Sequence, residues 1–393
     1  MIKISFVGDV TCDRPFLNAA KKDDKYNFTG AFDNIKQLFD SSDYLVGNLE
    51  TTFCGNKVAY NKGLHYNTPD EFIEEIKCSG INLLTTANNH CFDGGIKGLL
   101  RTRQMVINSG FDITGTFDDQ KEDRYLLKEI SNVKVAFFSY TYSVNRYPNV
   151  KIPSNIADYI NLLKPCKRLP LKYKIINKLF PYDLKRRMRI IMKKPTISAY
   201  PDKLHPETID QGYLDRISCQ IKNAKREADI VVFCIHIGGQ FNEKPGEYSE
   251  YMMKFLKEQG VDVIIGHHPH TIQKTTVSTD GAICAYSLGG FNLSPSAIYI
   301  NHECKPEYSQ LLNIYIDKDR KSIVKCTFSF VKILENKNAF INVVPAADLY
   351  RKLKGKEKEE LLSDIKSLYQ RITSTEHITD FVSEEYVIFE SKR

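Results

Sequence analysis

The residues of this chain best suited to chemistry are carboxylates, amides and histidines in five short stretches. They are Gly8-Asp9, Gly47-Asn48-Leu49-Glu50, Ala87-Asn88-Asn89-His90, Ile235-His236-Ile237-Gly238 and Gly266-His267-His268-Pro269-His270. Carboxylate and amide oxygens together with imidazole nitrogens suit manganese, iron or zinc, and the set offers no soft sulfur. If the stretches converge in the fold, they predict a site for one or two divalent transition metals.

Each stretch taken alone has an ordinary structural explanation. An Asp at the end of a strand is more often a turn residue or a helix N-cap than a ligand. His236 could equally be a hydrogen-bonded histidine of the core. The segment from His267 to His270 resists such explanations, because three imidazoles within four residues have little structural use. His268 and His270 can direct two nitrogens at one point, so the stretches together favour a metal site.

All five stretches lie at the ends of segments that we expect to be strands. The expected strands are Ile2–Val7, Tyr44–Val46, Leu83–Thr86, Val133–Tyr140, Ile230–Ile237 and Val261–Ile265. Apolar residues three or four positions apart predict helices at Ala31–Phe39, Glu71–Ser79, Gly95–Ser109, Asp210–Ala228 and Ser249–Gln259. This alternation indicates a layered α/β fold, in which loops beyond the carboxyl ends of strands line the ligand crevice.

The pattern divides the chain into one large domain and two additions. The domain spans residues 1–335, and its last part predicts consecutive strands with more antiparallel pairing. Those strands are Ile283–Leu288, Leu311–Asp317 and Cys326–Ile333. A basic insert at about 150–204 interrupts the domain. A charged extension follows at 336–393, with one helix near Lys356–Ile372.

The N-terminus and the cysteines bear on where the protein works. Met1 to Val7 reads as a core strand, so we expect no signal peptide. No apolar run approaches the roughly 18 residues of a transmembrane helix. The ten cysteines are scattered without a CxxC pair, which favours a reduced compartment. These features predict a cytoplasmic protein, with at most a peripheral contact at the inner membrane face.

The sequence resembles the bacterial capsule-synthesis CapA family, whose proteins act in poly-gamma-glutamate synthesis. The matching stretches are FVGDV, VGNLET, GINLLTTANNHCFDGGIKGL, SYTYSVN, ADIVVFCIHIGG, GVDVIIGHHPHTIQ and AYSLGGF. They cover about residues 1–145 and 205–295. That family is similar to the calcineurin-like metallophosphoesterases. The resemblance therefore implies an α/β, metallophosphoesterase-like four-layer fold with a central β-sandwich flanked by helices.

The resemblance also implies a role for each matching residue. The metal ligands would be Asp9, Glu50, Asn89, His236, His268 and His270, with Glu50 in the bridging position. His90 would be the catalytic histidine that stabilises the transition state, and Asp93 would orient its ring. Asn88, His267 and Thr11 would lie beside the ligands and support them.

Three positions depart from the family patterns. Thr11 stands where the wider superfamily has a ligand histidine, Cys91 replaces an acidic residue, and Gln240 stands where CapA proteins have Glu. These changes imply one firmly bound and one labile metal. The implied function is a metal-dependent hydrolase for phosphoesters, with amide or ester bonds less favoured, in capsule or exopolymer synthesis. The alternative is a non-catalytic accessory that binds the polymer (poly-gamma-glutamate or a polysaccharide) or its synthase.

A single basic segment accounts for the positive net charge of the chain. Lys164–Lys194 contains twelve Lys or Arg and one Asp, so its removal would change the formal charge from +7 to −4. Interleaved apolar residues predict a surface for an anionic polymer, a phosphorylated substrate or an anionic membrane. The anion-binding residues would be Lys185, Arg186, Arg187 and Arg189. A solvated excursion that covers an apolar edge is an equally open explanation. No nucleic-acid motif accompanies the charge, so nucleic acid is not an expected partner.

Overall fold

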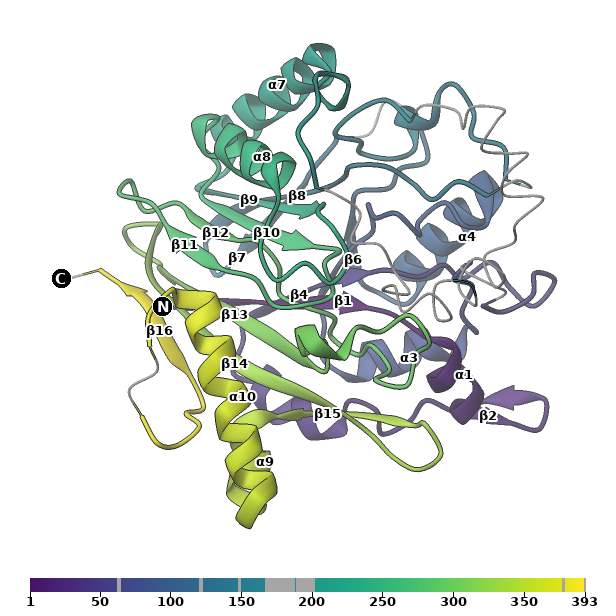
Figure 1. Cartoon of the computed structure of the whole chain (residues 1–393). Coiled ribbons are helices and arrows are strands. Elements are labelled where there is room, and N and C mark those ends of the chain that lie inside the picture. The colour runs from purple at the N-terminus through teal and green to yellow at the C-terminus, as the bar shows by residue number, and fades with distance from the viewer. Residues whose placement is uncertain are drawn as a thin grey trace.

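Two β-sheets packed face to face, with helices on their outer sides, make up the computed structural model of the chain (Figure 1). The structure describes residues 1–61, 65–119, 123–147, 150–166, 188, 202–376 and 379–391. The anion-binding residues expected in the basic insert lie outside this part of the chain. They are Lys185, Arg186, Arg187 and Arg189.

The first sheet joins the two ends of the chain. Among the described residues it has eight strands in the order β15-β14-β13-β1-β4-β5-β6, with β16 also paired to β14. The strands are β1 (Ile2–Val10), β4 (Tyr44–Leu49), β5 (Leu83–Thr85), β6 (Asp112–Thr114), β13 (Tyr308–Asp317), β14 (Ser322–Glu335), β15 (Ile341–Pro345) and β16 (Tyr386–Glu390). Strands β1, β4, β5 and β6 are parallel, whereas β13 to β16 pair antiparallel. The parallel half brings the ends of β1, β4 and β5 to one edge.

The second sheet is built from the middle of the chain. Its described strands follow the order β11-β12-β10-β9-β8-β7. They are β7 (Leu126–Ile130), β8 (Val133–Thr141), β9 (Ile230–His236), β10 (Val263–His267), β11 (Thr275–Val277) and β12 (Ile283–Ala285). Strands β8, β9, β10 and β12 are parallel. His236 and His267 are directly paired at the ends of β9 and β10. A small separate ribbon joins β2 (Lys21–Lys22) to β3 (Lys25–Tyr26).

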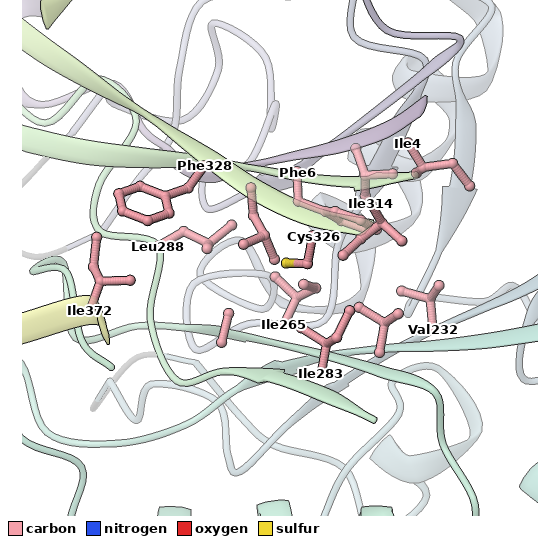
Figure 2. Close-up of a cluster of buried hydrophobic side chains, with 14 of the residues drawn as sticks. Ile4, Phe6, Val232, Ile265, Ile283, Leu288, Ile314, Cys326, Phe328 and Ile372 are labelled. Atoms are coloured by element: carbon pink, nitrogen blue, oxygen red, sulfur yellow. The ribbon is translucent and has the colours of Figure 1, made fainter. Parts of the chain in front are cut away.

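The main hydrophobic core lies between the two sheets. Figure 2 shows Ile4 and Phe328 of the first sheet facing Val232 and Ile265 of the second. Alternate residues of a strand point to opposite faces, so Leu45 of β4 packs on the outer side instead. All nine residues of β1 are buried, because both faces of this central strand are covered. The strands were therefore visible in the sequence as continuous apolar runs because both of their faces are buried.

Helices form the two outer layers. On the first sheet lie α1 (Arg14–Ala20), α2 (Lys36–Phe39), α3 (Glu71–Cys78) and α4 (Gly95–Asn108), and on the second lie α7 (Gln211–Glu227) and α8 (Glu247–Glu258). Short 3-10 turns occur at η1 (Asp33–Ile35), η2 (Ile156–Asp158), η3 (Pro206–Thr208) and η4 (His302–Cys304). The α/β four-layer architecture expected from the sequence is confirmed.

The segment after residue 335 is part of the sandwich. The expected helix is present as α10 (Gly355–Thr373), preceded by α9 (Ala346–Lys352). The same segment also supplies β15 and β16 to the first sheet, which its charged composition did not indicate. One face of α10 enters the core between the sheets through Leu361, Ile365, Leu368 and Ile372. A boundary at 335/336 would thus fall inside this sheet.

The start of the expected insert also packs on the core. Leu162 forms a bridge with Thr141, and Ile160 forms one with Thr116.

Within the described part of the chain, no helix is long and apolar enough to cross a membrane.

Candidate metal centre

The strand ends of both sheets meet at one buried cluster of polar side chains. Asp9 belongs to β1, Glu50 directly follows β4, and Asn89 lies in the loop after β5. His236 ends β9, and His268 and His270 lie in the loop after β10. These six side chains are at most 4% exposed. The structure therefore brings together all the ligands expected from the sequence.

The cluster contains two groups of potential metal ligands that share one carboxylate. Asp9, Glu50 and His270 form one group, and Glu50, His236 and His268 form the other, each with ligand atoms within 4.8 Å of one another. His270 Nδ1 lies 3.0 Å from Asp9 Oδ2, and its Nε2 lies 3.7 Å from Glu50 Oε1. In the second group, His236 Nε2 lies 3.5 Å from Glu50 Oε1. Glu50 is thus the residue that the two groups share.

These residues fit a divalent metal. Both carboxylate oxygens of Glu50 are buried and have no hydrogen-bond partner among the described residues. Leaving a buried carboxylate uncompensated is costly, and metal coordination is one way to avoid the cost. Two ligand atoms that each lie about 2.0–2.2 Å from one ion are about 3.0–3.6 Å apart. The 3.0 Å between His270 Nδ1 and Asp9 Oδ2, and the 3.5 Å between His236 Nε2 and Glu50 Oε1, fall in that range. The buried groups could therefore bind metal ions.

Burial and mutual charge perturb the titration of these groups. Burial, and then the charge of Asp9, raise the pKa of Glu50 well above its usual range. Burial also acts to raise the pKa of Asp9, but the neighbouring His267 and His270 imidazoles outweigh it and hold that pKa well below its usual range. Burial, and then the charge of His270, lower the pKa of His268 to about 3. Neutral imidazoles are the form that binds metals.

Asp9 is held in place by a close crossing of two chain segments. Its backbone N–H donates to Gly289 O at 3.1 Å, and Phe291 N donates to Asp9 O at 2.8 Å. A Cβ atom on Gly8 would lie 1.9 Å from Gly289 O, so the crossing requires glycine at position 8. The Asp9 carboxylate accepts hydrogen bonds from Asn48 Nδ2 at 2.7 Å and from His268 N at 3.1 Å.

His90 lies beside the cluster with its ring fixed from several sides. Its Nδ1 lies 2.7 Å from Asp93 Oδ2, the contact expected from the sequence. The Tyr66 ring stacks on the imidazole at 4.2 Å between centroids, and Tyr66 N donates to Asp93 at 2.7 Å. Asn145 Nδ2 lies 3.4 Å from His90 Nε2. Asn145 Oδ1 also accepts from Asn89 Nδ2, which leaves Asn89 Oδ1 directed at His236 Nε2.

The three residues expected to support the ligands have different surroundings. Asn88 Nδ2 donates to Leu49 O at 2.7 Å, and its Oδ1 accepts from His90 N, so it ties the β4 and β5 ends together. His267 Nδ1 lies 3.3 Å from Asp9 Oδ1 but joins neither ligand group of the described residues. Thr11 is held through its backbone by Asn292, at 2.8 and 2.7 Å. It places no imidazole there.

Several residues near the cluster were not among the site residues predicted from the sequence. Asp13 is fully buried and accepts hydrogen bonds from the Tyr66 and Tyr299 hydroxyls and from Ser294 N. Tyr66 and Tyr299 are single aromatic residues in loops, and only the tertiary fold brings them to Asp13. Asn145, in contrast, closes the quoted SYTYSVN stretch, so its position in that motif could have marked it.

Comparison with known proteins agrees with the resemblance seen in the sequence. The family described as "Bacterial capsule synthesis protein PGA_cap" matches residues 3–294. PGA biosynthesis protein CapA of Bacillus subtilis is 25% identical over 297 residues, 74% of this chain and 63% of that protein. Capsule biosynthesis protein CapA of Bacillus anthracis is 25% identical over 295 residues, 74% of this chain and 59% of that protein.

This chain thus spans less than two thirds of the length of these two relatives. Among solved structures, a phosphatase from Mycoplasma pneumoniae is similar with a TM-score of 0.45 and 15% identity. The similarity covers 84% of this chain and 93% of the phosphatase. Because the family match extends over most of the chain and includes every candidate ligand of the cluster, the chain belongs to the bacterial capsule synthesis protein family PGA_cap.

Proposed function

We propose that this chain is a metal-dependent hydrolase that cleaves phosphoester bonds during the synthesis of a capsule or exopolymer. The observation that carries the proposal is the pair of ligand groups sharing Glu50, with His90 held beside them. The names of the CapA relatives supply the process, and poly-gamma-glutamate or a polysaccharide is the corresponding polymer.

The candidate ligands form two groups that would hold manganese, iron or zinc. Asp9, Glu50 and His270 would hold one ion, and Glu50, His236 and His268, with Asn89 beside His236, would hold the other. The chemistry that a bound divalent metal supplies here is Lewis-acid polarisation of phosphoryl oxygens. The protein excludes most water from these ligands, since each is at most 4% exposed. Electrostatic interactions are stronger in such a site than in bulk water.

His90 is the residue that handles the proton. The Asp93 carboxylate accepts a hydrogen bond from His90 Nδ1 and thereby keeps a proton on that nitrogen. The other nitrogen, Nε2, is then the one that can exchange a proton with a substrate oxygen. The stacked Tyr66 ring limits rotation of the imidazole. Asp93 and Tyr66 are thus positioning residues in this proposal, and His90 is the catalytic one.

The substrate and partners form the outer part of the proposal. A phosphorylated substrate or an anionic polymer would suit the basic insert, through Lys185, Arg186, Arg187 and Arg189. The same basic insert would make a peripheral contact with synthase proteins or with an anionic membrane. Thr11 favours a second candidate function, a non-catalytic accessory that binds polymer or synthase. Its backbone is held by Asn292, and its side chain supplies no imidazole where the wider superfamily has a ligand histidine.

Substitution of His90 separates the two candidates. The chain should be purified without chelator, analysed for metal, and assayed on p-nitrophenyl phosphate and bis(p-nitrophenyl) phosphate. His90→Asn should retain the metal and lose roughly 10²–10⁴-fold in kcat, the usual contribution of a general acid or base. His302→Asn, an exposed histidine of η4, is the matched control and should keep full activity.

Two results would go against the hydrolase. Metal-loaded wild-type protein that cleaves neither ester would favour the accessory. A His90→Asn variant with unchanged kcat would show that this histidine is not in the reaction. Loss of metal from His90→Asn would instead place His90 among the ligands.

A further inference from the structure

The loop that carries His268 and His270 has an unfavourable backbone conformation. His268 has φ of 97° and His270 has φ of 56°, and Phe241 in the neighbouring loop has φ of 58°. Residues with a Cβ rarely adopt positive φ, and they persist in it only where the surrounding structure imposes it. In this conformation the two histidine rings reach the metal cluster. Something outside the loop must therefore hold it.

Arg371, in the last turn of α10, contacts this loop directly. Its Nη1 donates to Thr271 Oγ1 at 3.1 Å, one residue beyond His270. The same nitrogen donates to Cys304 O at 3.0 Å, and Nη2 donates to Glu243 Oε1. The Arg371 side chain is only 13% exposed. One guanidinium therefore holds the loop after β10, the η4 turn and the loop after β9.

The three loops that Arg371 contacts are also joined to one another by hydrogen bonds. Thr271 Oγ1 donates to Cys304 O at 2.7 Å. Cys304 Sγ in turn donates to Phe241 O at 3.0 Å, and Phe241 N donates to Pro269 O at 2.7 Å. Pro269 separates the two ligand histidines. A movement at Arg371 is thus transmitted to both sides of His270 through hydrogen bonds.

We propose that Arg371 is a positioning residue for the metal centre, and that docking of α10 and metal binding are coupled through it. The inference rests on the proposed metal centre. The planar guanidinium suits this position because it presents several donors in a fixed geometry to separate acceptors. Arg371 lies beyond residue 294, where the family match ends. The C-terminal helix of this chain thus contributes to a site whose ligands all come from the matched region.

The coupling makes a measurable prediction about metal affinity. Binding of Mn²⁺ and Zn²⁺ to metal-free full-length protein should be measured by isothermal titration calorimetry. Arg371→Ala should weaken affinity roughly tenfold or more, because loss of groups that orient metal ligands typically costs 10–100-fold. Arg371→Lys, which keeps the charge but not the planar fork, should recover part of the loss. Lys366→Ala is the matched control on α10, since Lys366 pairs with Asp380 instead.

A second variant tests the route of the coupling and guards against misfolding of Arg371→Ala. Thr271→Val keeps the shape of the side chain and removes the hydroxyl that joins Arg371 to Cys304. It should weaken metal affinity in the same direction. Because both changes break one path, the double variant should lose less than the product of the two single effects. Metal-free circular dichroism and urea midpoints of all variants establish that the fold is retained.

The outcomes separate this inference from the metal centre itself. His270→Ala serves as the reference. If it loses metal while Arg371→Ala and Thr271→Val bind as wild type, the coupling is wrong and the metal centre stands. An equal loss in Lys366→Ala, or independent effects of the two changes, would also overturn the coupling. If His270→Ala binds metal as wild type, the metal centre is wrong and the inference falls with it.

Discussion

Replacing Glu50 by Gln should make the metal-free protein more stable and the metal-bound protein less stable. Glu50 is fully buried, and neither carboxylate oxygen has a hydrogen-bond partner among the described residues. Burial and the charge of Asp9 raise its pKa. A carboxyl group whose pKa is raised on folding reduces stability at every pH above its unfolded pKa of about 4.3. At pH 7.5 the neutral amide should therefore relieve an unfavourable charge.

The size of the effect follows from these contacts. An unsatisfied buried polar group costs about 1–3 kcal/mol, and more when charged. Without metal, Glu50→Gln should thus raise the free energy of unfolding by about 1–3 kcal/mol. With free metal at 100 times its Kd, wild-type protein should gain about 2.7 kcal/mol from binding. The variant should gain far less, because the shared carboxylate serves both ligand groups. The order of stability should therefore reverse when metal is added.

Urea unfolding at pH 7.5, with EDTA and with excess Mn²⁺ or Zn²⁺, measures both effects. The chain has 22 tyrosines and no tryptophan, so tyrosine fluorescence and circular dichroism are suitable signals. Glu75→Gln is the control, because Glu75 is buried but accepts a hydrogen bond from Phe32 N at 3.1 Å. It should give no reversal. The reasoning is refuted if Glu50→Gln is the less stable protein in EDTA, or if metal stabilises both proteins equally.

Two other predictions concern the C-terminal strand region and the basic insert. Burial acts to raise the pKa of Glu385, but hydrogen bonds from Thr327 and Tyr315 outweigh burial and lower it. The contribution of Glu385 to folding stability is therefore present above about pH 4.3 and lost as the pH falls. Glu385→Gln should cost less than about 1 kcal/mol at pH 7, because the residue is solvent-exposed, and less than that at pH 3.5. An equal cost at both pH values in urea titrations would contradict this. Reversing four insert charges should reduce low-salt sedimentation with anionic vesicles or polyglutamate while metal content stays constant, at about 1 kcal/mol per residue near a membrane. The changes are Lys185→Glu, Arg186→Glu, Arg187→Glu and Arg189→Glu, and wild-type protein that binds neither anion would refute a binding role.

The central strands and the outer helices were predictable because each is long, buried on a defined face and periodic. Val133–Tyr140 and Ile230–Ile237 correspond to β8 and β9, and Gly95–Ser109 corresponds to α4. The short or polar strands were missed. The strand β16 is apolar in sequence but only five residues long, has one buried residue, Tyr386, and lies in a segment of charged composition. Its pairing with β14 depends on a partner about sixty residues earlier in the chain.

The residues that gather in the buried cluster were also predictable from the sequence. Polar residues that follow apolar strands must leave a parallel sheet at the same edge, whatever the lengths of the intervening loops. Asp9 and Glu50 lie at the ends of neighbouring strands of the first sheet, and His236 and His268 lie at the ends of neighbouring strands of the second. Strand order and family motif therefore led to the same residues.

What the sequence by itself determined is which side chains gather at the strand ends, since periodicity and polarity specify the strands and where they stop. Only the tertiary structure decided how those side chains are held. The stack of Tyr66 on His90 and the contact of Arg371 with Thr271 join residues 24 and 100 positions apart. Loops have no periodicity, and an arginine on a helix can pair with many acceptors of similar energy. Such contacts are selected only when the packed sheets and α10 fix the distances between them.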